Sequence, residues 1–168
     1  MTYALLKTFH LLGVLLWVGG MLFVLSFLRP ALAVLAPPER LALMREVLRR
    51  FFAAVVVAVL LVLGTGFGMA GLAGRVARTS AQAAGAAGAA GGSAGPSGWP
   101  LGWIVMAAIG LAMAVIFGHI RLALYTRFTR ALDGGDRPAA AAALDRIRLE
   151  VGVNLVLGLA AVAAVVLL

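Results

Sequence analysis

The sequence predicts an all-α membrane protein, a bundle of four transmembrane helices with both termini outside. The chain has 168 residues, of which 64% are hydrophobic and 12% charged, with a mean hydropathy of +1.09. Soluble domains are roughly 45–50% apolar and about 25% charged. A soluble globule of this composition would have too few polar side chains to cover its surface. Four long apolar runs, separated by clusters of arginine, complete the prediction.

The four spans are expected at about 3–28, 51–73, 99–120 and 151–168, in a single domain covering 1–168. Each approaches or exceeds the roughly 20 apolar residues that a spanning helix needs. Each is also too long for a transmembrane strand and lacks alternation. Residues 31–33 (Ala-Leu-Ala) resemble a signal-peptide cleavage site, but the preceding apolar run is too long, so we expect the first span to be retained.

The loops set the predicted orientation. Segment 29–50 carries five arginines and segment 121–150 carries six, whereas the middle connection has only Arg75 and Arg78. Basic residues favour the cytoplasmic side. The first and third connections are therefore expected in the cytoplasm.

The three connections differ in character. Residues 80–98 are rich in Ala, Gly and Ser and predict a flexible exterior loop. Pro37-Pro38 is placed to begin a helix that continues into the second span. Residues 133–136 form a turn signal, and Pro138 then opens the last helix. The third and fourth helices should thus form a long hairpin that projects into the cytoplasm.

Small residues recur every three or four positions on two spans and are expected to let helices approach closely in lipid. The alternative is that Ala and Gly are merely abundant. The positions are Gly64, Gly68 and Gly71 on the second span and Gly110, Ala114 and Gly118 on the third.

His10 and His119 are the only histidines, and ionisable groups inside a span are functional hypotheses by default. His10 shares a helix face with Gly13, Trp17, Gly20 and Met21, so this face is expected to meet other helices. The face of His119 (Ala108, Ala112, Val115 and Leu122) is also mostly small. The alternative for each ring is a hydrogen bond to a backbone carbonyl or a lipid headgroup.

Depth separates the two histidines. At a rise of 1.5 Å per residue, His10 lies about 10 Å and His119 roughly 30 Å from the outer surface. A metal–nitrogen bond is about 2 Å, so one ion cannot bind both rings. At the outer level, Met69 and Met106 should lie at the depth of His10. A His/Met/Met set is soft and uncharged, which suits Cu(I) or a pair of axial haem ligands. Methionine also fills apolar space without any such role.

At the inner level, Glu150 begins the fourth span and Asn154 follows one turn later. We expect His119, Arg121 and Glu150 to form a polar cluster near the cytoplasm, most simply a solvated salt bridge.

Several function classes are excluded. There is no cysteine, and therefore neither a disulfide nor a thiolate site. No HExxH, GxSxG or phosphate-binding loop is present, so we assign no catalytic residue. The arginines follow the loops rather than a stripe, which argues against nucleic acid as a partner.

The stretch Lys7–Gly20 (KTFHLLGVLLWVGG) resembles the first helix of CopD-type copper-resistance membrane domains. Arg50-Phe51-Phe52 and Thr65-Gly66 fit the same family. The resemblance implies copper import or delivery, with His10 as a ligand, methionines completing the site and a periplasmic copper carrier as the partner.

The chain is also similar to HemJ-type membrane protoporphyrinogen oxidases, through His10, Trp17, His119 and Glu150. It departs from them at Ala108, where they carry a lysine. This resemblance implies haem b, with His10, His119 and Trp17 at the cofactor.

We therefore expect a copper-handling protein of a bacterial-type inner membrane. The first alternative is a haem-b protein with electron-transfer or porphyrinogen-oxidase-like activity and a redox partner. The second is an accessory subunit without a cofactor. Membrane lipid is expected around the bundle, and whether the chain is an enzyme or a homo-oligomer stays open.

Overall fold

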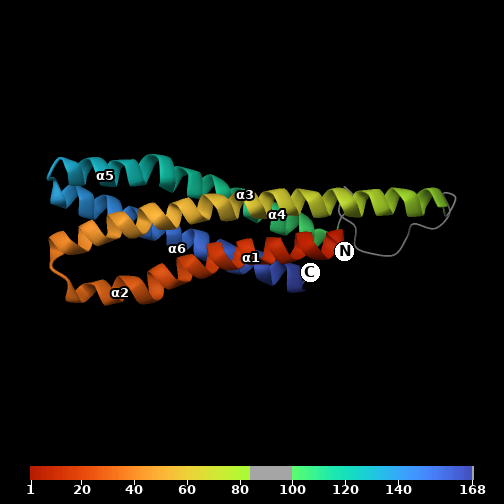
Figure 1. Cartoon of the computed structure of the whole chain (residues 1–168), viewed down its shortest axis with the longest axis horizontal. Coiled ribbons are helices and arrows are strands. Elements are labelled where there is room, and N and C mark those ends of the chain that lie inside the picture. Colours follow the sequence, from red (N-terminus) through yellow and green to blue (C-terminus); the bar gives the residue numbers. More distant parts are fainter. Residues whose placement is uncertain (84–99, 168) are drawn as a thin grey trace.

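Four long helical runs make up the computed structural model, which describes residues 1–83 and 100–167 (Figure 1). In the first run, α1 (Thr2–Phe23) continues through η1 (Val24–Leu28), α2 (Arg29–Ala31) and η2 (Leu32–Val34). The second run is α3 (Pro37–Ala83). In the third, α4 (Leu101–His119) continues through η3 (Ile120–Leu124) and α5 (Tyr125–Asp133), and α6 (Arg137–Leu167) is the fourth. All 4 runs are long and apolar enough to cross a membrane, and the described residues contain no strand. The predicted all-α, multi-pass four-helix bundle is confirmed.

The runs form two antiparallel pairs. α1 packs along α3, while α4 and α5 pack along α6. Both chain ends lie at one end of the bundle, and the connections from η2 to α3 and from α5 to α6 lie at the other (Figure 1). The termini therefore share one side, and that this side is the outside stays a prediction from the arginines.

The helices extend well beyond the apolar spans at the arginine-rich end. α3 has 47 residues, hence a length of about 70 Å against a hydrocarbon core of about 30 Å. It begins at Pro37, and α6 begins at Arg137 with Pro138 next, as expected where a missing N–H is harmless. The turn before α6 contains Gly135, whose φ of +75° is strained for other residues.

At its other end, α3 continues past the predicted span. It includes residues 80–83, which were expected to belong to the exterior loop. The remainder of that segment, 84–98, lies outside the described residues.

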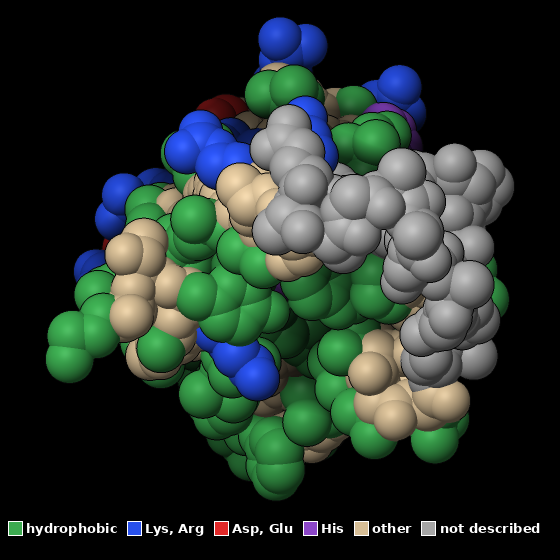
Figure 2. Space-filling model, turned by 90° about the vertical axis from the view of Figure 1, so that its right-hand side faces the viewer, with side chains coloured by type: hydrophobic (Ala, Val, Ile, Leu, Met, Phe, Trp, Pro, Cys, Tyr) green, Lys and Arg blue, Asp and Glu red, His purple; other side chains and the backbone are tan. Residues whose placement is uncertain are grey.

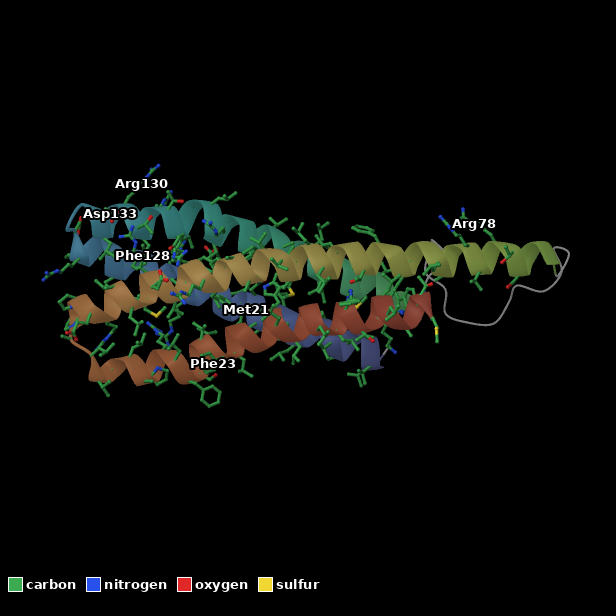
Figure 3. All side chains as sticks on the ribbon, viewed as in Figure 1. Met21, Phe23, Arg78, Phe128, Arg130 and Asp133 are labelled. Carbon is green, nitrogen blue, oxygen red and sulfur yellow. The ribbon has the colours of Figure 1, made fainter. Side chains whose placement is uncertain are left out.

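The tightest packing lies toward the arginine-rich end. Phe52 and Phe128 are about 1% and 0% exposed, and Phe52 meets the rings of Phe117 and Tyr125 edge-to-face at 5.8 Å and 5.4 Å. Met21 and Phe128 point between helices, whereas Phe23 points away from the bundle (Figure 3). Between Ala58 and Ser80, where α3 runs toward the termini, its buried residues are Thr65, Met69 and Ala70. In the described residues, the half of the bundle that carries the termini is therefore more sparsely packed than the arginine-rich half.

Large apolar side chains cover the outside of the spans. Leu15, Val57 and Val115 are 69%, 63% and 67% exposed. Figure 2, which looks along the bundle from the end that carries the termini, shows hydrophobic side chains over much of the visible surface. Such a surface suits contact with lipid chains.

The predicted small residues differ in how closely they approach a neighbouring helix. A Cβ at Gly68 would lie 3.3 Å from Cδ1 of Leu6 on α1, so the predicted close approach is confirmed there. A Cβ at Gly64, Gly71, Gly110 or Gly118 would meet no neighbouring atom within 4 Å, so the expected packing role of these four was wrong. Periodic spacing places small residues on one face but does not determine whether that face meets a helix or lipid. Gly13 is instead in close contact, since a Cβ there would lie 2.7 Å from Val62 Cγ2. A Cβ at Gly158 would likewise lie 2.9 Å from Cγ2 of Val18 on α1.

Candidate functional site

His10 is held by a threonine on the neighbouring helix. Its ring lies half-buried on α1, and Nδ1 is 3.0 Å from Oγ1 of Thr65 on α3. Thr65 is 7% exposed, and its Oγ1 also lies 2.6 Å from the carbonyl oxygen of Leu61. The imidazole is therefore fixed between two helices inside the apolar region.

The hydrogen bonds of Thr65 favour one assignment of the proton on His10. Oγ1 of Thr65 lies 2.6 Å from the carbonyl oxygen of Leu61 and 3.3 Å from that of Val62, so we assign the hydroxyl proton to Leu61, the nearer acceptor. Oγ1 then accepts its other bond from Nδ1–H of His10. In this tautomer Nε2 carries a lone pair, which is the form of the ring that binds a metal ion.

Gly66 lies beside the ring. A Cβ at this position would be in ordinary van der Waals contact, 3.4 Å from Cε1 and 3.7 Å from Nδ1 of His10. The consecutive residues Thr65 and Gly66 thus both face the imidazole. The sequence held a signal for this contact, because Thr65 is the only side chain in 51–73 with a hydroxyl, amide or charge. The pairing with His10 was nevertheless not predicted.

The two predicted methionines have different positions relative to this pair. Met69 is 9% exposed and lies on α3 one turn beyond Thr65, about 6 Å farther along the helix. Met106 is half-buried on α4, which packs mainly on α6. Of the predicted soft set, His10 and Met69 therefore share the α1–α3 pair, and the participation of Met106 stays a prediction.

Trp17 belongs to the core. It is 3% exposed and packs edge-to-face on Phe117 at 6.3 Å, two turns along α1 from His10. Gly13 and Met21 are buried on the same face, so the predicted orientation of this face toward other helices is confirmed.

His119 lies in a different environment. Its Nδ1 is 2.8 Å from Oε2 of Glu150, and the two side chains are 53% and 21% exposed. Of the cluster predicted from His119, Arg121 and Glu150, the contact between His119 and Glu150 is confirmed, but Arg121 is not part of it. Its guanidinium carbon instead lies 5.5 Å from the centre of the Tyr125 ring. The small face predicted for His119 is exposed, from Ala108 to Leu122, and does not meet a helix.

The histidines thus belong to separate sites, as their predicted depths required. His10 bonds to α3, whereas His119 bonds to α6. Within residues 1–83 and 100–167, no three His, Asp or Glu side chains gather into a metal site.

Asn154 contributes an unpaired polar atom to the core. It is 1% exposed, and its Oδ1 has no hydrogen-bond partner in the described part of the chain. Unpaired buried oxygens are rare in native proteins. The sequence indicated a polar residue one turn beyond Glu150, but not its complete burial.

Comparison with models of protein families, with curated proteins and with solved structures finds no match for this chain.

Proposed function

We propose that this protein handles copper in a bacterial-type inner membrane, in import or delivery, and binds Cu(I) through Nε2 of His10. The observation that carries the proposal is the bond from His10 to Thr65, which in the assigned tautomer leaves a lone pair on Nε2 within an apolar span. Imidazole and thioether ligands together suit Cu(I), and Met69 is buried one turn away on α3. The resemblance of 7–20 to CopD-type first helices supports the same assignment.

In this proposal copper is the cargo rather than a resident group. The residues of this chain have three tasks: Nε2 of His10 donates a lone pair, Thr65 orients the ring, and the apolar walls exclude water. Met69 is the proposed second ligand, and Met106 is a third only if α4 approaches the α1–α3 pair.

Copper content of purified variants tests this proposal. His10→Ala and His10→Gln are loaded with Cu(I) under reducing, oxygen-free conditions, desalted and analysed for metal per chain. Both should lose bound copper, and His10→Gln keeps a donor for Thr65, so that the fold is preserved. His119→Ala is the matched control and should retain copper. Unchanged copper in both His10 variants would refute the proposal.

Haem b competes for the same nitrogen, because a neutral imidazole is also an axial haem ligand. An optical spectrum of protein from haem-supplied cells, oxidised and then reduced with dithionite, separates the two ligands. A Soret band that disappears in His10→Ala would show that His10 binds haem and would refute copper as its ligand. A featureless spectrum together with copper bound through His10 is the expected result.

A further inference from the structure

A basic groove opens at the arginine-rich end of the bundle, far from His10. It lies between η1 and α2 on one side and the starts of α3 and α6 on the other, and its volume is about 730 Å³. That volume falls within the ~300–1,000 Å³ typical of ligand sites. Apolar side chains line the groove, among them Val24, Leu41, Met44, Ile147 and Val151.

The charge in this groove is strongly unbalanced. Four arginines line it, Arg29, Arg40, Arg137 and Arg148, against a single acidic residue, Asp145. Arg29 bonds to Asp145 at 2.9 Å. In the described part of the chain, the side chains of Arg137 and Arg148 have neither a hydrogen bond nor an ion pair. Arg40 already donates from Nη2 to the carbonyl oxygens of Ala33 and Leu35, and its Nε is buried. The free donors that the groove offers to an anion are therefore those of Arg137 and Arg148.

A second groove continues from the first along the membrane-spanning part of α6. The two share Leu25, Asp145 and Arg148, and the second then follows Gly152, Val156 and Leu157. From Arg148 to Leu157 the distance along the helix is about 14 Å at 1.5 Å per residue, close to half of a 30 Å hydrocarbon core. Its length thus matches one leaflet.

The position of the arginines fits a headgroup. Arg29 directly follows the first predicted span, and Arg148 comes shortly before the fourth, so both lie at the expected level of the lipid phosphates. Arginine binds phosphate through paired N–H donors, and basic pockets between transmembrane helices bind anionic headgroups.

We infer that the two grooves together bind one anionic phospholipid of the surrounding leaflet. Its phosphate lies beside Arg29 and Arg148, and an acyl chain lies along α6 past Gly152. The site is independent of copper binding.

Native mass spectrometry of delipidated protein in a non-ionic detergent tests this inference, with phosphatidylglycerol and phosphatidylcholine of identical acyl chains as probes. Arg148→Gln should lower phosphatidylglycerol affinity about tenfold, because a charge-assisted hydrogen bond is lost. The matched control is Arg146→Gln, which removes the same charge from an exposed position of α6 that lines neither groove. Its affinity should stay close to that of the parent protein.

Gly152→Leu tests the acyl-chain part. A Cβ at Gly152 would meet no atom within 4 Å, so the larger side chain fits the fold but fills the second groove. We expect a loss of phosphatidylglycerol binding with unchanged thermal stability of the lipid-free protein. Equal binding by Arg148→Gln and Arg146→Gln would overturn the inference. So would unaffected binding in Gly152→Leu, competition by glycerol phosphate as strong as by the lipid, or a copurified peptide in the groove.

Discussion

The hydrogen bond between His10 and Thr65 makes a quantitative prediction that does not depend on any bound metal. Thr65→Val keeps the shape of the side chain but removes the acceptor 3.0 Å from Nδ1. Hydrogen bonds between transmembrane helices average about 0.6 kcal/mol and reach about 1.7 kcal/mol. Thr65 is 7% exposed, so water replaces the lost partner poorly. We expect an interaction of about 1 kcal/mol.

A double-mutant cycle isolates this interaction. Equilibrium unfolding in mixed micelles, with increasing SDS, is measured for Thr65→Val, His10→Leu and the double variant in copper-free protein. The bond from Thr65 to the Leu61 carbonyl is lost on both sides of the cycle and therefore cancels. Thr65→Ser keeps the hydroxyl and is the control. A coupling energy within about 0.3 kcal/mol of zero, the usual scatter for independent sites, would refute the assigned bond.

The remaining predictions concern packing and the exposed pair. Phe52→Ala should lower the free energy of unfolding by about 3 kcal/mol, because it opens a cavity among aromatic rings. Phe23→Ala removes an outward-facing ring and should change the free energy of unfolding by less than about 0.5 kcal/mol. The same SDS titration measures both variants. Gly13→Leu should separate α1 from α3 and lower the melting temperature, while Gly64→Leu, where a Cβ meets no atom within 4 Å, should leave it unchanged; equal melting temperatures would contradict the packing. Glu150→Gln breaks a solvated pair and should alter stability by at most about 1 kcal/mol in thermal unfolding.

The fold followed from the sequence because lipid imposes one strong rule, that each span needs a long apolar helix. The arginines and prolines also located the helical extensions, including the start of α3 at Pro37. Burial on the face of Gly13, Trp17 and Met21 was predictable from helical periodicity.

The details of the site were less predictable, since they depend on how helices rotate against one another. Periodicity suggested that Gly64, Gly68 and Gly110 all approach other helices, yet of these three only Gly68 has a neighbouring side chain within 4 Å of its Cβ position. The sequence indicates Thr65 through its polar side chain and a family resemblance, but one sequence does not reveal that this residue lies opposite His10. Arg121 was placed with Glu150 by proximity along the membrane normal, but its helical angle directs it to Tyr125.

The uneven packing along the bundle has a consequence for motion. Local opening is easiest where few side chains are buried, and here that is the end with the chain termini, where His10 and Met69 lie. Amide protons of α1 and α3 near Thr65 should therefore exchange with solvent sooner than those near Phe52. A ligand bound between α1 and α3 would slow that exchange. Ligand binding should therefore make α1 more rigid near His10 and leave the exchange rates at the arginine-rich end unchanged. The bundle thus has a rigid arginine-rich end and a more mobile end at the chain termini.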